Sequence, residues 1–126
     1  MKRYLKSGKP TEDLIQATFF QWVYLCEQIH PELQLCFAIP NGGTRNIREA
    51  IKFKRTGVRK GVPDVFLPVP KGEYKGLWIE FKSDKGEQTV AQIIYFEQLK
   101  NQGYRCEICR DQNTAIAVVK TYLGLS

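Results

Sequence analysis

The chain has 126 residues, of which 43% are hydrophobic, so it fits one domain with its own core and argues against a second domain. The formal net charge of +6 and a pI near 9.2 suit a polyanionic partner. No apolar run is long enough to cross a bilayer, and Met1-Lys2-Arg3 leads into polar sequence, so we expect a cytoplasmic protein without a membrane partner.

The first predicted helix follows a basic tail, residues 1–10, which we expect to be flexible. Thr11 suits the N-cap position, and Glu12 and Asp13 place acidic side chains in the first turn, where they complement the helix dipole. Pro31 ends the run. Apolar residues follow helical spacing and predict a face that packs on a sheet: Ile15, Phe19, Trp22, Val23, Cys26 and Ile29.

A short buried strand is predicted over residues 35–39, and the turn sequence Pro40-Asn41-Gly42-Gly43 ends it. The basic segment 44–56 has a helical pattern that predicts an inward face of Ile47, Ala50 and Ile51, with Gly57 as the stop. Two further strands, 62–67 and 77–82, are joined by a Gly-containing loop and predict a hairpin.

The last part of the chain predicts a helix over 89–102, a strand over 104–109 and a helix over 113–123. The first of these helices has a predicted apolar face of Val90, Ile93, Ile94, Phe96 and Leu99. A hairpin joins two strands and a helix crosses over to another, so the order α-β-α-β-β-α-β-α indicates an α/β fold with a mixed sheet flanked by helices. We expect one domain over residues 1–126.

Charged residues lie on the two hairpin strands, where a buried strand normally carries none. Strand side chains alternate between faces, so Glu80 and Lys82 share one side of their strand, and the returning turn can place Asp64 beside them. Two carboxylates and an ammonium are costly to bury together. Such a group commonly holds a divalent cation and activates a water, which points to phosphodiester hydrolysis. The alternative is a salt-bridge cluster without catalysis.

A stretch rich in Arg and Lys, residues 45–60, leads directly into Pro63-Asp64. Arg and Lys contacts to phosphates set register and affinity without reading bases, so we interpret this stretch as a nucleic-acid contact. A solvated helix face is the alternative. Together with the turn residue Asn41, the predicted nucleic-acid-binding residues are Arg45, Arg48, Lys52, Lys54, Arg55, Arg59 and Lys60.

Four cysteines are present, and Cys106 and Cys109 form a Cys-x-x-Cys. Zinc sites place such a pair in a tight turn, whereas these two lie in a predicted strand with side chains on opposite faces. We expect buried, reduced thiols and no structural zinc.

With these motifs in place, the chain resembles the PD-(D/E)XK nuclease superfamily and, within it, the VRR-NUC family of virus-type replication-repair nucleases. Pro63-Asp64 and Glu80-Phe81-Lys82 carry the resemblance, which covers about residues 12–123. It implies a restriction-endonuclease-like core. Further matching features are Glu12-x-x-x-Gln16, Ile39-Pro40-Asn41-Gly42-Gly43, the segment from Gly57 to Asp64, and Gln92, Leu99 and Gly103-Tyr104.

The resemblance implies a role for each matching position. Asp64 and Glu80 would bind Mg2+ or Mn2+, with the carbonyl of Phe81 as a further ligand and Glu12 approaching the metal from the first helix. Lys82 would orient or help deprotonate the attacking water, or stabilise charge on the phosphate. Gln16 and Gln92 would be polar groups around this site. Without such roles, Glu12 is simple helix N-terminal charge and Gln92 a solvent-facing amide.

The sequence and the resemblance together predict a metal-dependent DNA endonuclease. No DNA-reading domain is attached, which favours structure over sequence as its specificity, with branched DNA such as Holliday junctions or flaps as substrate. Standalone members of the family imply a homodimer, and the small size fits a phage or prophage origin. The alternatives are a sequence-specific restriction-like nuclease and a non-catalytic basic nucleic-acid-binding module. The chain departs from the family pattern in loop 83–88, which is more acidic than expected for a loop in contact with phosphate.

Overall fold

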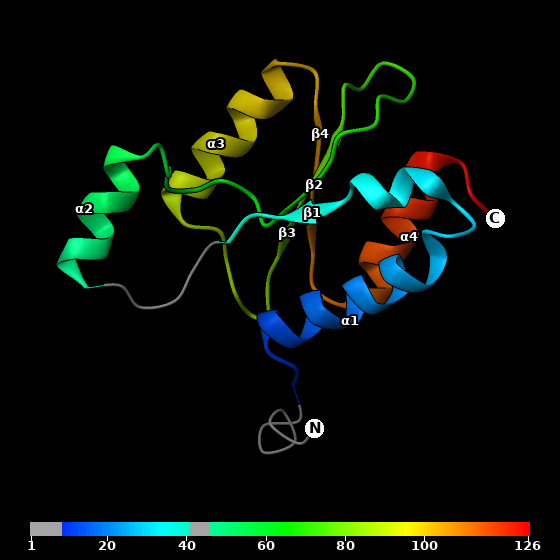
Figure 1. The fold of residues 1–126 in the computed structure, drawn as a ribbon, viewed down its shortest axis with the longest axis horizontal. Helices are drawn as coiled ribbons and strands as arrows, with labels where there is room; N and C mark the ends of the chain where they lie inside the picture. The colour runs from blue at the N-terminus through cyan, green and yellow to red at the C-terminus, as the bar shows by residue number, and fades with distance from the viewer. Residues whose placement is uncertain (1–8, 41–45) are drawn as a thin grey trace.

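The computed structural model describes residues 9–40 and 46–126. The predicted mixed α/β fold is confirmed (Figure 1). In chain order the described elements are α1 (Glu12–Cys26), the 3-10 helix η1 (Pro31–Leu35), β1 (Phe37–Ala38), α2 (Ile47–Arg55), β2 (Val65–Leu67), β3 (Leu77–Phe81), α3 (Val90–Asn101), β4 (Arg105–Cys109) and α4 (Gln112–Leu123).

The four strands form one sheet in the order β1-β2-β3-β4. The pairs β1-β2 and β2-β3 are antiparallel, and β3-β4 is parallel. The chain therefore turns back between β2 and β3, while α3 makes the crossover to β4 that a parallel pair needs. The register sets Val65 opposite Ile79, which brings the residue before β2 close to the end of β3.

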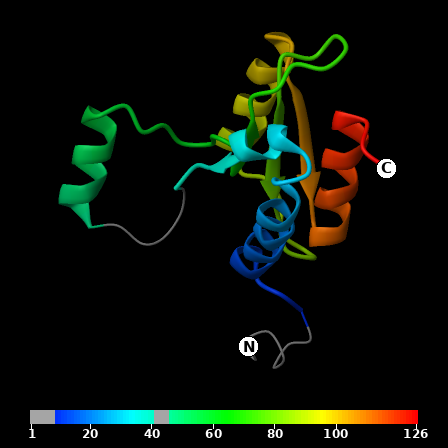
Figure 2. The same ribbon diagram turned by 45° about the vertical axis from the view of Figure 1, so that its right-hand side comes forward.

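The hydrophobic core lies between the sheet and the helices α1 and α4, which cover one face together, while α3 lies on the other face (Figures 1 and 2). Ile15, Phe19 and Val23 recur every four residues on α1, so they form one stripe that is at most 1% exposed. The sheet contributes alternate residues to the same core: Val65, Leu67, Leu77, Ile79 and Phe81. The predicted packing of the first helix on the sheet is thus confirmed.

Side chains cap the helices as the local sequence indicates. Thr11 is the N-cap of α1, and its hydroxyl accepts a hydrogen bond from the Leu14 N–H at 3.1 Å. Asp111 caps α4 in the same way. These contacts satisfy backbone N–H groups that have no partner within the helix, so they determine where each helix begins.

One predicted inward face is wrong, and a second predicted apolar face is largely exposed. Ile47 and Ile51 on α2 are 77% and 60% exposed, and no described residue of α2 is buried, because this helix stands apart from the sheet (Figures 1 and 2). On α3 only Phe96 is buried, and Val90, Ile93 and Ile94 face outward. Periodicity finds an apolar stripe, but it does not supply the surface that covers it.

The region between α1 and β1 also differs from the prediction. The first helix ends at Cys26, five residues before Pro31, and Ile29 beyond it is 74% exposed. Pro31 begins the 3-10 helix instead of only stopping a helix, because its fixed φ suits a first helical position. This helix uses part of the predicted strand 35–39, so β1 keeps two residues.

Some predicted features lie outside the described residues, among them the tail before Lys9, Asn41 and Arg45. Across the part of the chain that the structure describes, no helix combines the length and the apolar character needed to span a membrane. All four cysteines are free thiols. Burial raises the pKa of Cys36 and of Cys109 to about 12, so both thiols stay protonated at neutral pH.

Candidate active site

Asp64 and Glu80 lie together at one end of the β2-β3 hairpin. Asp64 immediately precedes β2, and its Oδ2 accepts a hydrogen bond from the Phe81 N–H at 2.7 Å. Its own carbonyl accepts from the Ile39 N–H at 2.7 Å, so the backbone at Asp64 is also tied to β1. Two main-chain contacts, from Phe81 of β3 and from Ile39 directly after β1, therefore hold Asp64 beside Glu80.

Glu80 is a buried carboxylate with incomplete compensation. Its side chain is 2% exposed, and Oε1 has no hydrogen-bond partner. Burial raises the pKa of Glu80 to about 8, together with the nearby carboxylates of Asp64 and Glu12 and a side-chain hydrogen bond with Asp64, although Lys82 opposes the shift. A buried acid that lacks sufficient positive charge around it is the setting that a divalent cation stabilises.

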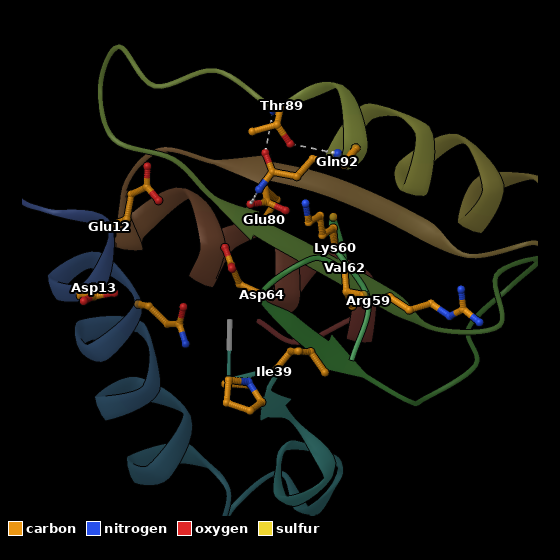
Figure 3. Close-up of a pocket in the computed structure, with 15 residues that line it drawn as sticks. Glu12, Asp13, Ile39, Arg59, Lys60, Val62, Asp64, Glu80, Thr89 and Gln92 are labelled. Atoms are coloured by element: carbon orange, nitrogen blue, oxygen red, sulfur yellow. Dashed lines mark hydrogen bonds between the residues drawn. The ribbon is translucent and has the colours of Figure 1, made fainter. Parts of the chain in front are cut away.

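Gln92 supports Glu80 from the first turn of α3. Its Nε2 donates a hydrogen bond to Glu80 Oε2 at 2.9 Å, and its Oε1 accepts from the Thr89 N–H at 2.8 Å (Figure 3). The Thr89 hydroxyl accepts from the Gln92 N–H, which completes a capping box. One amide therefore both caps α3 and orients the buried carboxylate.

Lys82 approaches Glu80 from the same strand face. Its Nζ lies 4.0 Å from Glu80 Oε2, and its side chain is 9% exposed. The backbone N–H of Lys82 donates to the Cys109 carbonyl at 3.1 Å, which continues the β3-β4 pairing one residue beyond β3. The ammonium is thus held close to the carboxylates, although Lys82 does not line the adjoining cleft.

Glu12 reaches the same region from the first residue of α1. Its Oε2 accepts a hydrogen bond from the Ser83 N–H at 3.3 Å, directly after Lys82. Its carboxylate also contributes to the raised pKa of Glu80. Gln16, one turn further along α1, lines the cleft. The interpretation of Glu12 as helix-terminal charge alone therefore does not describe its contacts.

A cleft of about 680 Å³ opens over Asp64 and Glu80 (Figure 3). Its walls come from the start of α1, the end of β1, the loop before Asp64 and the start of α3. Gly61 has φ +86° and lies against the Ala91 carbonyl, where a Cβ would collide, so a glycine is needed for this loop to pack on α3. The loop brings Arg59 and Lys60 to the cleft.

The predicted basic residues divide into two groups. Arg59 and Lys60 line the cleft, and the Arg59 side chain points away from the carboxylates (Figure 3). Arg48, Lys52, Lys54 and Arg55 are exposed on α2, which projects away from the sheet (Figure 2). The structure therefore places only part of the positive stretch at the cleft, and the rest extends outward from it.

Thr89 was not among the predicted site residues, although it lines the cleft and caps α3. The pattern Thr89-Val90-Ala91-Gln92 is a capping box that the sequence displays openly. The predicted helix over 89–102 already placed Gln92 in a first turn, and recognising the box would have added its capping role. Its second contact, with Glu80, depends on where α3 lies on the sheet and leaves no local signal.

Asp64 and Glu80 fit a divalent cation by their chemistry. Mg2+ and Mn2+ take hard oxygen ligands, and the free Glu80 Oε1 offers one beside a second carboxylate. Within the described ranges, no three His, Cys, Asp or Glu side chains are grouped to hold a metal. A cation here would therefore complete its shell with carbonyl oxygens and water, as Mg2+ commonly does.

Comparison with known proteins places the chain in a family. A family model for the VRR-NUC domain matches residues 2–113. A solved structure of a VRR_NUC domain protein is 30% identical, with a TM-score of 0.77, and the match covers 93% of this chain and 91% of that one. No curated protein matched the sequence. The chain belongs to the VRR-NUC domain family.

Proposed function

We propose that this protein is a metal-dependent endonuclease that hydrolyses DNA phosphodiester bonds in the cleft over Asp64 and Glu80. Membership of the VRR-NUC family indicates a nuclease domain. The observation that supports the metal dependence is Glu80, a carboxylate 2% exposed with an unpartnered oxygen, between Asp64 and Lys82.

Asp64 and Glu80 would hold Mg2+ or Mn2+, with the Phe81 carbonyl and water as further oxygen donors. The predicted role of Glu12 as a metal ligand is not supported, because among the described residues it is not grouped with these two carboxylates as a ligand set, and its carboxylate instead accepts from the Ser83 N–H. When bound, such a cation lowers the pKa of a coordinated water and offsets charge that develops on the phosphate. Gln92 keeps Glu80 in one orientation through its hydrogen bond at 2.9 Å. Gln16 lies in the cleft wall, where its amide can contact water or a phosphate oxygen.

Lys82 would supply positive charge at the reacting group. Its ammonium is shielded from solvent, so its interaction with a phosphate oxygen or an attacking water is stronger than at an exposed position. It can orient that water or take part in its deprotonation. Because it is not among the proposed metal ligands, its removal should lower the rate more than the affinity for the cation.

DNA would reach the cleft along the positive loop and helix. Arg59 and Lys60 line the cleft, and the exposed cations of α2 extend the positive surface. Contacts of this type bind phosphates and do not read bases. This supports a structure-specific nuclease acting on branched DNA, such as Holliday junctions or flaps. A sequence-specific, restriction-like nuclease is the enzymatic alternative, and a basic binding module is the non-catalytic one.

We also propose that the protein is a homodimer. A nine-residue helix is too short to be stable by itself in water, yet α2 carries an apolar stripe with no buried residue. Ile47 and Ile51 need a covering surface. The exposed Val90, Ile93 and Ile94 of α3 in a second copy are a surface of the same character.

The test is cleavage of labelled four-way junction, flap, duplex and single-stranded DNA with Mg2+, Mn2+ or EDTA. Glu80→Ala and Lys82→Ala are compared with wild type, and Glu97→Ala and Lys100→Ala serve as matched controls because this exposed pair lies on the outer part of α3. We expect cation-dependent cutting that falls at least ~100-fold in the first two variants and persists in the controls. Binding without cutting in every condition would identify a non-catalytic module.

A further inference from the structure

Arg110, directly after β4, makes contacts that the proposed chemistry does not by itself explain. Its Nη1 lies 2.9 Å from the Ser83 carbonyl oxygen and 2.6 Å from that of Gly86, with the Asp84 carbonyl at 3.4 Å. One guanidinium nitrogen thus gathers three carbonyl groups of the turn that follows Lys82. An exposed arginine that served only for solubility would not converge on one turn in this way.

The turn from Ser83 to Gly86 is held on its other side by the candidate site. The Ser83 N–H donates to Glu12 Oε2, and the Gly86 N–H closes the turn on the Ser83 carbonyl at 3.1 Å. A Cβ on Gly86 would lie 3.3 Å from Glu12 Oε2 and 3.0 Å from the Ser83 hydroxyl. The turn is therefore packed between Glu12 and Arg110.

We infer that Arg110 is a positioning residue of the candidate active site, acting through the turn Ser83 to Gly86 on Lys82 and Glu12. The β-sheet pairing ends at Lys82, whose N–H donates to the Cys109 carbonyl of β4 at 3.1 Å. Beyond Lys82, strand pairing no longer fixes the backbone. Its orientation there depends on the hydrogen bonds from Arg110 to the carbonyl groups of the turn. This inference rests on the proposed nuclease function and adds a residue to it.

The same contacts bear on the acidic character of loop 83–88. Asp84 pairs with Lys9 at 3.4 Å, and Arg110 adds a second positive charge beside the turn. The turn is therefore partly neutralised before DNA arrives. The three carbonyl contacts of Arg110 are made by Nη1 alone, and a guanidinium carries five N–H donors, so kinetics must separate the two roles. Positioning lowers kcat, whereas a phosphate contact raises KM.

The experiment measures kcat and KM of Arg110→Ala and Arg110→Lys on the best DNA substrate with Mg2+. Arg105→Ala is the matched control, because Arg105 lies at the opposite end of β4 and pairs with Glu107 at 2.8 Å. We expect kcat of Arg110→Ala to fall at least tenfold with KM within twofold of wild type. Arg110→Lys should recover part of kcat, since an ammonium also donates to carbonyl oxygens.

Gly86→Ala disturbs the same turn from the Glu12 side and should reproduce the loss of kcat. Hydrogen exchange in residues 83–86, measured without DNA, should be faster in Arg110→Ala than in wild type. Unchanged kcat in Arg110→Ala, or a raised KM with unchanged kcat, would overturn the inference. If the wild type cuts no DNA, the proposed nuclease function fails, and unchanged exchange in Arg110→Ala would separately refute the role of Arg110 in holding the turn.

Discussion

Asp64 binds the backbone of Phe81 across the β2-β3 hairpin, with 2.7 Å between Oδ2 and N. This contact joins one carboxylate to the main chain between Glu80 and Lys82. Asp64 cannot move away from β3 without breaking it. The hydrogen bond and the negative charge of Asp64 are therefore two separate contributions, one to structure and one to chemistry.

Substitutions at Asp64 should separate these contributions. Asp64→Asn keeps an oxygen that can accept from the Phe81 N–H but removes the charge, whereas Asp64→Ala removes both. We expect both variants to lose cleavage, and only Asp64→Ala to lose about 1–2 kcal/mol of unfolding free energy, because a half-buried N–H is then unpaired. Urea unfolding and cleavage assays check this. Equal stability of the two variants would contradict it.

Glu80 should make the cation-free protein less stable as pH rises. Its pKa is about 8 in the folded protein against an ordinary value of 4.5, so the folded state binds the proton more tightly. Stability is lost between these values as pH increases. Glu80→Gln cannot ionise, so it should gain about 1–3 kcal/mol over wild type at pH 8 in EDTA, and little at pH 4.5.

Thermal unfolding over this pH range measures the effect of Glu80. Adding Mg2+ at pH 8 should raise the melting temperature of the wild type more than that of Glu80→Gln, since only the wild type has the full carboxylate pair. A difference between the two proteins that is the same at pH 4.5 and pH 8 would rule out this account.

At position 92, glutamate should replace glutamine in the helix cap but not in the hydrogen bond to Glu80. Glutamate can accept from the Thr89 N–H and so keeps the capping box, yet it offers no donor to Glu80 Oε2. We expect Gln92→Glu to slow cleavage about tenfold with a small change in melting temperature. Thr89→Ala is the comparison, with about 1 kcal/mol lost from the cap. A Gln92→Glu variant that cuts at the wild-type rate would show that this contact is dispensable.

Gly61 should resist substitution more strongly than Gly57. Both have positive φ, +86° and +98°, but a Cβ on Gly61 would collide with the Ala91 carbonyl, whereas the space around Gly57 is open. We expect Gly57→Ala to cost about 1 kcal/mol and Gly61→Ala at least ~2 kcal/mol more, because the loop before Asp64 must move off α3. Urea denaturation decides the point, and equal losses would argue against close packing here.

The apolar stripe of α2 should matter for assembly and not for folding of one chain. Ile47 and Ile51 are mostly exposed, so Ile47→Ser with Ile51→Ser should leave the unfolding of a single chain almost unchanged. We expect the double variant to weaken dimerisation at least ~100-fold, since each buried isoleucine contributes about 1.5–3 kcal/mol. Leu25→Ser, at a 77% exposed position on α1, is the control. Light scattering that finds wild type monomeric at micromolar concentration would remove the dimer.

The sequence alone determined the features that depend on near neighbours along the chain. Alternation along a strand put Glu80 and Lys82 on one side, and the return of the chain brought Asp64 to them. The cap at Thr11 and the core stripe of α1 were equally visible in the sequence. Both depend on residues that lie within one or two helical turns of each other. The mixed sheet followed from the order of these elements.

Only the tertiary structure decided how deeply Glu80 is buried, which residues hold it and which apolar faces are covered. Gln92 and Glu12 reach the site from separate helices, and Arg110 reaches the turn beyond it from the end of β4. These contacts join residues 12 to 71 positions apart, and no local periodicity encodes such a distance. For the same reason the stripes on α2 and α3 predicted helices correctly but not their exposure. A pattern records that a face is apolar, whereas burial depends on a surface contributed from elsewhere.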